Sequence, residues 1–73
     1  MSKLGNISGK QAAKAFQKAG REIIGQVGSH VVMSKPGVRA NLSIPQHKDL
    51  SIGTLRALIR HTGLTVHEFL QLL

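Results

Sequence analysis

The chain has 73 residues, of which ten are Lys or Arg and three are Asp or Glu, so its formal net charge is +7. This length predicts one small domain over residues 1–73, and without cysteine no disulfide or thiolate metal site can stabilise it. The charge predicts a polyanion or an acidic protein as the partner. Since the aromatic residues are two Phe, RNA recognition by base stacking is disfavoured and phosphate contacts should lead. No apolar leader and no run of ~18 apolar residues is present, so we expect a cytoplasmic protein without a membrane span.

The first helix is predicted to follow a loose polar lead over residues 1–7. Ser8 and Gln11 have the spacing of a capping box. Gly20 stands where a left-handed residue commonly ends a helix. One face of this helix is apolar (Ala12, Phe16 and Ala19) and the other is basic (Lys10, Lys14 and Lys18). The lysine stripe is either a phosphate-binding face or an ordinary solvated face.

Three strands are predicted over residues 23–27, 30–34 and 39–44. Gly28 and Ser29 form the turn between the first two strands, and Lys35-Pro36-Gly37-Val38 has the Pro and Gly positions of a type II turn. If Lys35 faces Val38, the predicted pairs are Met33 with Ala40, Val31 with Leu42, and His30 with Ser43.

This pairing separates the sheet into a buried face and a solvent face, because successive side chains alternate. A slip of one residue would bury the charged set, so the facing is strongly specified. The buried face is predicted to hold Val31, Met33, Ala40 and Leu42. The solvent face is predicted to hold His30, Val32, Arg39, Asn41 and Ser43.

Two more helices are predicted after a loop over residues 44–50. Ser51 can cap the first of them and Gly63 ends it, and its apolar stripe comprises Ile52, Leu55, Leu58 and Ile59. Thr65 and Glu68 form a second capping box, which begins the last helix. The fold class is therefore α+β, in the order α-βββ-α(α), with a three-stranded antiparallel sheet and the helices on one face.

RNA cleavage is the chemistry that suits this composition. Three carboxylates are too few for a two-metal site, and a cysteine nucleophile is absent, so we expect neither a metal nor a cofactor. RNA carries its own nucleophile, the 2′-hydroxyl. A protein must remove that proton, protonate the departing 5′-oxygen and stabilise the charge on phosphorus. One positioned imidazole typically contributes ~100- to 10,000-fold by acid–base catalysis, and cationic side chains supply electrostatic stabilisation.

Four histidines compete for the catalytic role. His67 lies inside a capping box, and His61 lies near a helix C-terminus where a cation is favourable, so both are predicted to be structural. His47 stands in a loop beside Lys48 and could contact phosphate. His30 follows a glycine turn on the solvent face, where its side chain is presented rather than packed.

The order of motifs resembles the HicA family of toxin mRNA interferases. The resemblance is carried by Lys18-Ala19-Gly20, Gly28-Ser29-His30, Ile44-Pro45-x-His47, Gly53-Thr54-Leu55-Arg56, Gly63-Leu64-Thr65 and Glu68-Phe69. It implies a fold similar to the double-stranded-RNA-binding domain and an RNA endonuclease that needs neither ribosome nor metal. It also implies that His30 is catalytic, and that a HicB antitoxin covers the active face. One departure is Arg21, where many members have an aromatic residue.

The remaining site residues are predicted from facing and charge. Candidate phosphate and sugar contacts are Lys10, Lys14, Lys35, Arg39 and His47, with Gly28 and Ser29 allowing close backbone approach. The second acid–base group is His47, a lysine or the substrate itself. We expect the free chain to be monomeric. Two rival interpretations are a non-catalytic double-stranded-RNA-binding module and a basic adaptor for an acidic protein.

Overall fold

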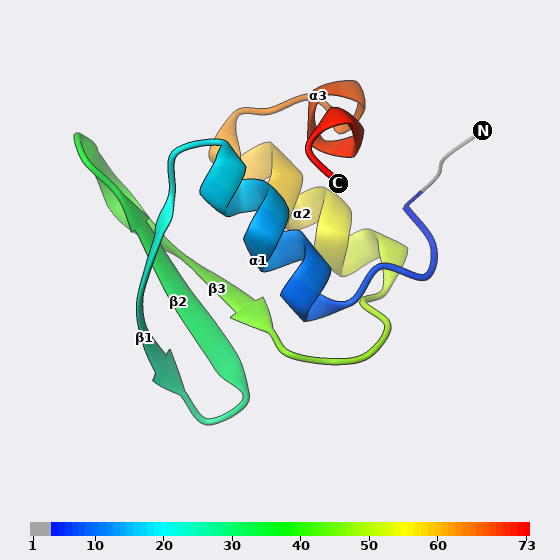
Figure 1. Ribbon diagram of the computed structural model, residues 1–73, viewed down its shortest axis with the longest axis horizontal. Coiled ribbons are helices and arrows are strands. Elements are labelled where there is room, and N and C mark those ends of the chain that lie inside the picture. Colours follow the sequence, from blue (N-terminus) through cyan, green and yellow to red (C-terminus); the bar gives the residue numbers. More distant parts are fainter. Residues whose placement is uncertain (1–3) are drawn as a thin grey trace.

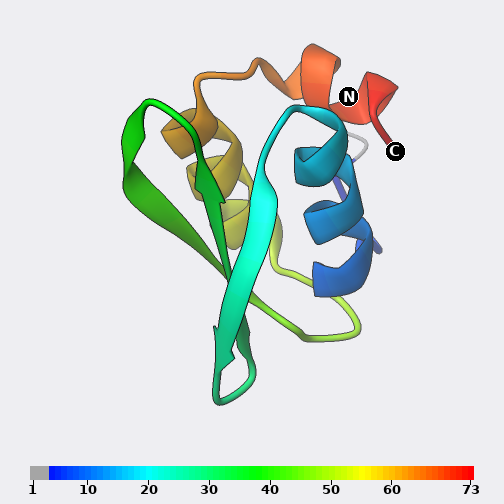
Figure 2. The ribbon, with the colours of Figure 1, turned by 60° about the vertical axis from the view of Figure 1, so that its left-hand side comes forward.

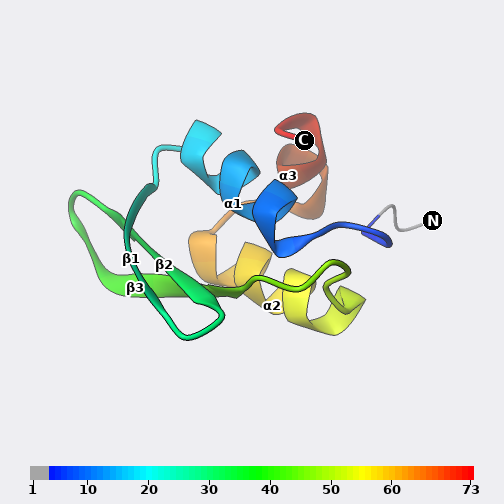
Figure 3. The same ribbon diagram turned by 60° about the horizontal axis from the view of Figure 1, so that its bottom comes forward.

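The computed structural model describes residues 4–73 and shows one antiparallel sheet with helices on one side of it (Figures 1 and 3). The elements are α1 (Gly9–Lys18), β1 (Glu22–Val27), β2 (His30–Lys35), β3 (Val38–Pro45), α2 (Ile52–Thr62) and α3 (Val66–Gln71). The strand order is β1-β2-β3, so β1 and β3 form the two edges. The predicted α+β class and element order are confirmed. Among the helices described, none has the length and apolar character needed to span a membrane.

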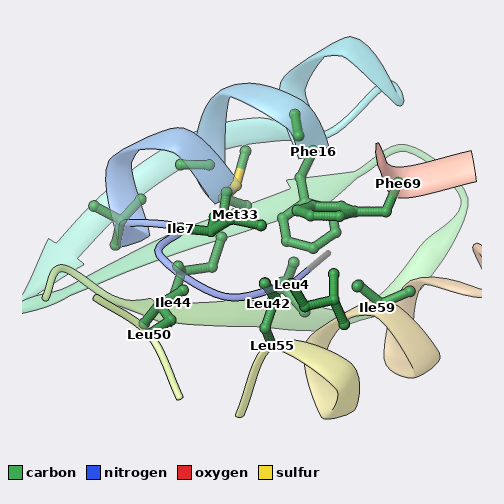
Figure 4. Packing of buried hydrophobic residues seen from close by; sticks show 14 residues of the cluster. Leu4, Ile7, Phe16, Met33, Leu42, Ile44, Leu50, Leu55, Ile59 and Phe69 are labelled. Atoms are coloured by element: carbon green, nitrogen blue, oxygen red, sulfur yellow. The ribbon is translucent and has the colours of Figure 1, made fainter. Parts of the chain in front are cut away.

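The core lies between the sheet and the helices, and every element except β1 contributes a fully buried side chain to it (Figure 4). Phe16 of α1 and Phe69 of α3 meet with ring centroids 5.1 Å apart and planes tilted by 44°. Such aromatic pairs contribute about 0.5–1.5 kcal/mol beyond the area that they bury. This contact holds the short α3 on α1, and Leu70 and Leu72 pack against the same core.

The segment before α1 is part of the core. Leu4 and Ile7 are 0% and 4% exposed, and the Leu50 N–H donates a hydrogen bond to the Ile7 carbonyl at 2.8 Å. The predicted loose lead is therefore wrong for residues 4–7, while residues 1–3 lie outside the described residues. Two isolated apolar residues show no helix or strand period, so their burial depends on the loop that they meet.

Local signals at the helix ends are confirmed. Ser8 and Gln11 make both bonds of a capping box, at 3.0 and 2.9 Å. Thr65 and Glu68 make both bonds of the second. Hydrogen bonding to Thr65, chiefly from its backbone N–H, holds the pKa of Glu68 below its usual value. Gly63 ends α2 with φ of 82°, a backbone conformation that other residues adopt at a cost.

The β2–β3 register departs from the predicted one by two residues. Lys35 faces Val38 as predicted, but the next pairs are Met33 with Leu42, Val31 with Ile44 and His30 with Pro45. The ladder is irregular after the turn, because residues 39–41 of β3 stand against Ser34 alone. The predicted pairs Met33–Ala40, Val31–Leu42 and His30–Ser43 are thus wrong.

The side chains were nevertheless assigned to the correct faces of the sheet, because a register shift of an even number of residues keeps each side chain on the same face. Val31, Met33 and Leu42 are buried as predicted, and Ile44 joins them. Ala40 is exposed instead, because it lies in the irregular segment where β3 departs from its partner.

Arg21 is the one charged residue buried in the part of the chain that the structure describes, with 5% exposure. It follows Gly20, whose φ of 98° turns the chain out of α1. Its Nη1 atom is buried and has no hydrogen-bond partner among residues 4–73. The position where the resembled family has an aromatic side chain is therefore a packing position, occupied here by an Arg. A buried polar atom without a partner lowers stability.

We expect Arg21→Met to raise the free energy of unfolding by about 1–3 kcal/mol, since it keeps the apolar stem and removes the unpartnered group. Urea denaturation of both proteins measures the difference. Arg56→Met on the exposed side of α2 is the matched control and should change stability by less than ~0.5 kcal/mol. An Arg21→Met protein no more stable than the parent would contradict this account.

Candidate functional site

His30 is the first residue of β2 and lies directly after the β1–β2 turn. Gly28 supplies the turn with φ of 59°, and the His30 side chain is exposed. Its Nδ1 atom lies 3.2 Å from the Ser43 hydroxyl of β3. Ser43 is the diagonal neighbour of His30 across the ladder, on the same face of the sheet. The imidazole is therefore open to solvent on one side and oriented by a hydroxyl on the other.

Backbone hydrogen bonds connect this turn, the loop that follows β3 and the start of α1. The Gln46 N–H donates to the Ser29 carbonyl at 2.7 Å, and the Gly9 N–H of α1 donates to the His47 carbonyl at 2.9 Å. Within the β1–β2 hairpin, the Gln26 side chain donates to the Gly28 carbonyl at 3.0 Å. The turn, the loop and the start of α1 thus form one connected unit.

Gly9 allows this close approach. A Cβ atom at Gly9 would collide with the Pro45 carbonyl oxygen and would come within 2.9 Å of the Gln46 Cα. Only a residue without a side chain lets the first turn of α1 lie directly on the loop. The positions of His47 and of the turn that carries His30 depend on this contact.

Part of the predicted basic set gathers around this unit. Lys10 and Lys14 are exposed on α1 and line a hollow of about 480 Å³ between α1 and β1. Lys10 also lines a second hollow, of about 300 Å³, together with His47 and Lys48. Gln46 lines both hollows and bonds the turn before His30. The structure therefore brings the His30 turn, His47 and Lys10 to one end of the molecule.

Lys35 and Arg39 lie at the opposite end of the sheet. Lys35 ends β2, five residues from His30, which corresponds to about 17 Å of extended strand. Its side chain lies beside Gly20 at the end of α1. Arg39 stands in the irregular part of β3, next to the turn after β2. The two hairpin turns project at opposite ends of the sheet (Figure 1), so these cations do not lie with the His30 turn, His47 and Lys10.

A further hollow, of about 390 Å³, lies between β3 and α2. Ser43 and Pro45 line it from the strand and His61 lines it from the helix. Both strand residues are also neighbours of His30, since Ser43 is hydrogen-bonded to its ring and Pro45 is its partner in the β2–β3 ladder. Sequence reasoning missed His61 and Gln46 as neighbours of the site, because their placement depends on how α2 and the loop dock.

The chemistry available here is proton exchange beside cationic groups. Within residues 4–73 no group of three or more His, Cys, Asp or Glu side chains gathers. An exposed imidazole oriented by a hydroxyl is a side chain that can serve as a general acid or a general base. The lysines nearby can attract and hold an anionic substrate.

Comparison with known proteins decides the family. The model of a family described as the HicA toxin of bacterial toxin–antitoxin matches residues 9–64. The chain belongs to the HicA toxin family. The match begins at the first residue of α1 and ends after α2, so it contains His30 and all the other predicted site residues, while α3 follows it. No curated protein matches the chain. HicA membership confirms the family resemblance.

We expect Gly9→Ala to lower the free energy of unfolding by about 1–3 kcal/mol, because the added methyl group overlaps the loop. The control is Gly53→Ala in α2, where a Cβ meets nothing within 4 Å. Alanine favours a helix there by up to ~1 kcal/mol. Thermal unfolding should therefore shift in opposite directions for the two variants. Equal stability of both variants would show that α1 does not rest on the loop.

Proposed function

We propose that the chain is an mRNA-cleaving endoribonuclease, the toxin of a toxin–antitoxin pair, with His30 as its acid–base residue. The observation that carries this proposal is the exposed His30 imidazole, hydrogen-bonded to Ser43, in a HicA-family chain.

The reaction moves two protons. The 2′-oxygen of the RNA attacks the neighbouring phosphorus and loses its proton to a base. The bond from phosphorus to the 5′-oxygen breaks, and that oxygen gains a proton from an acid. The products of this step are a 2′,3′-cyclic phosphate and a free 5′-hydroxyl. His30 performs one of these transfers, and Ser43 holds its ring in position.

The basic residues fall into two groups, one at each end of the sheet. Lys10, Lys14 and His47 would hold phosphates close to His30, where Gly28 and Ser29 let the backbone approach. Lys35 and Arg39, about 17 Å away along β2, would hold phosphates further along the strand. His47 is the first candidate for the second acid–base group, and a lysine or the substrate itself is the alternative.

The biological setting follows from the family. We propose that the chain acts in the cytoplasm as a monomer when free, and that a HicB-type antitoxin covers its active face. Neither a metal nor another cofactor enters this scheme, since the nucleophile belongs to the substrate and the proton transfers belong to side chains.

A non-catalytic double-stranded-RNA-binding module is the second candidate function. The order of α1, the three strands and α2, together with the exposed lysines of α1, favours it equally. It gives no role to an imidazole at position 30. Both functions predict RNA binding that weakens steeply with salt, so only the appearance of products separates them.

We expect His30→Ala to reduce cleavage of a labelled structured RNA by at least about 100-fold, since it removes the acid–base group. The assay contains EDTA, so that traces of metal-dependent nucleases are silent. His67→Ala, in the exposed first turn of α3, is the matched control and should cleave like the parent. A folded His30→Ala protein that still cleaves would remove the proposed role. Retention of RNA without cleavage by the parent would favour the binding module.

We expect Ser43→Ala to lower kcat about fivefold with KM unchanged, because the loss of one hydrogen bond of about 1 kcal/mol loosens the catalytic ring without touching phosphate contacts. Ser43→Thr retains the hydroxyl and suits a strand, so it should restore kcat. Steady-state kinetics on the same RNA measures both constants. A rise in KM with kcat unchanged would place Ser43 in substrate binding instead of ring positioning.

A further inference from the structure

The strand β1 leaves an unusual amount of apolar surface exposed. Ile23, Ile24 and Val27 are 49%, 56% and 72% exposed. These are three of the six large apolar residues exposed within residues 4–73, and they come from one strand of six residues. Ile23 lies on the helix side of the sheet, since it pairs with the buried Met33, whereas Val27 lies opposite the exposed His30, so the strand presents apolar surface on both of its faces.

The same strand has a free edge. It pairs with β2 on one side only, so its other side carries a row of backbone N–H and C=O groups without strand partners. Proteins usually protect such edges with lysine or proline. β1 contains neither residue, and its single charge is Glu22. A bulge at Ile24 is its one irregularity.

A hollow with an apolar floor and a basic rim runs beside this edge. Figure 2 shows β1 at the outer side of the sheet next to α1. The hollow of about 480 Å³ between them has Ala13, Ile23 and Val31 among its lining residues. Lys10 and Lys14 line it from α1. It can accept apolar side chains while cations stand at its border.

We propose that β1 receives a strand from a partner protein, and that the side chains on the α1-facing side of this strand include both apolar and acidic residues. Its backbone would extend the sheet as a fourth strand, the pairing mode of peptides that add to sheet edges. Its apolar side chains would enter the hollow beside Ile23, and its carboxylates would meet Lys10 and Lys14. A length of about six residues, or about 20 Å, would cover β1.

The charge of the chain selects this occupant over the others. A second copy would bring another formal charge of +7 against the first, and like charges disfavour association. RNA offers neither a strand backbone nor apolar side chains for Ile24 and Val27. An acidic strand supplies a backbone that can pair with β1, apolar side chains for the hollow and carboxylates for the lysines.

The strand would also compete with RNA, since Lys10 and Lys14 are among the proposed RNA contacts. This competition rests on the proposed function, whereas strand addition does not. Cleavage by the parent is therefore measured separately, and its absence would leave the binding result unchanged.

The first test uses the full chain and three fluorescent peptides of about ten residues. The first, the Val–Glu peptide, has Thr at every second residue and Val and Glu in turn at the positions between, so that Val and Glu share one face of the strand. The second has Lys in place of Glu, and the third is the Val–Glu peptide with N-methyl groups on alternate backbone nitrogens, which blocks strand pairing. Fluorescence anisotropy should show saturable binding of the first peptide, at least about tenfold tighter than the other two. Amide NMR shifts should concentrate on residues 22–27. Equal binding of the N-methylated peptide, or shifts confined to other elements, would overturn strand addition.

Variants locate the surface on the protein. The double variant Ile23→Ser with Val27→Ser should weaken binding of the Val–Glu peptide about tenfold. Ile52→Ser is the matched control, because Ile52 is 45% exposed at the start of α2, and its affinity should equal that of the parent. Equal affinity of the double variant and the control would overturn the proposal. If the chain dimerises without peptide and the double variant abolishes this dimerisation, a second copy occupies the surface and the proposal is overturned.

Discussion

The position of the candidate site depends on the contact between the start of α1 and the loop that follows β3. Gly9 makes the approach possible, and its N–H bonds the His47 carbonyl. The same loop bonds the Ser29 carbonyl through the Gln46 N–H. These contacts are made by the backbone, so they fix the position of the β1–β2 turn without using any side chain that chemistry needs. His30 can therefore be exposed and still be held in place.

The sequence predicted the faces of the sheet better than its pairing. Side-chain alternation along β2 and β3 is visible in the residues themselves, and it survives any even shift. The irregular segment around Ala40 is not visible there, because it depends on how β3 pairs with β2 next to the turn. The same limit explains why Ser43 was placed on the correct face but opposite the wrong partner.

The helix caps were predictable because each is a contact within four residues. Ser8 with Gln11 and Thr65 with Glu68 need no tertiary structure to form. The burial of Leu4 and Ile7 and the place of His61 need docked elements, so sequence patterns carry no signal for them. The exposure of His30 was predictable from the alternation of side chains along β2, whereas its hydrogen bond to Ser43 depends on the observed register of β2 and β3.

The two proposed ligands would use the same cations for different reasons. RNA would approach Lys10 from the His30 turn and would be held chiefly through phosphates, so its affinity falls steeply with salt. An acidic strand would approach from β1 and would add backbone pairing and apolar burial, which salt weakens little. Since Lys10 lines both neighbouring hollows, each proposed ligand would lower the affinity of the other by direct competition for charge. This competition would require no conformational change, and rising salt would shift the balance from RNA toward the protein partner.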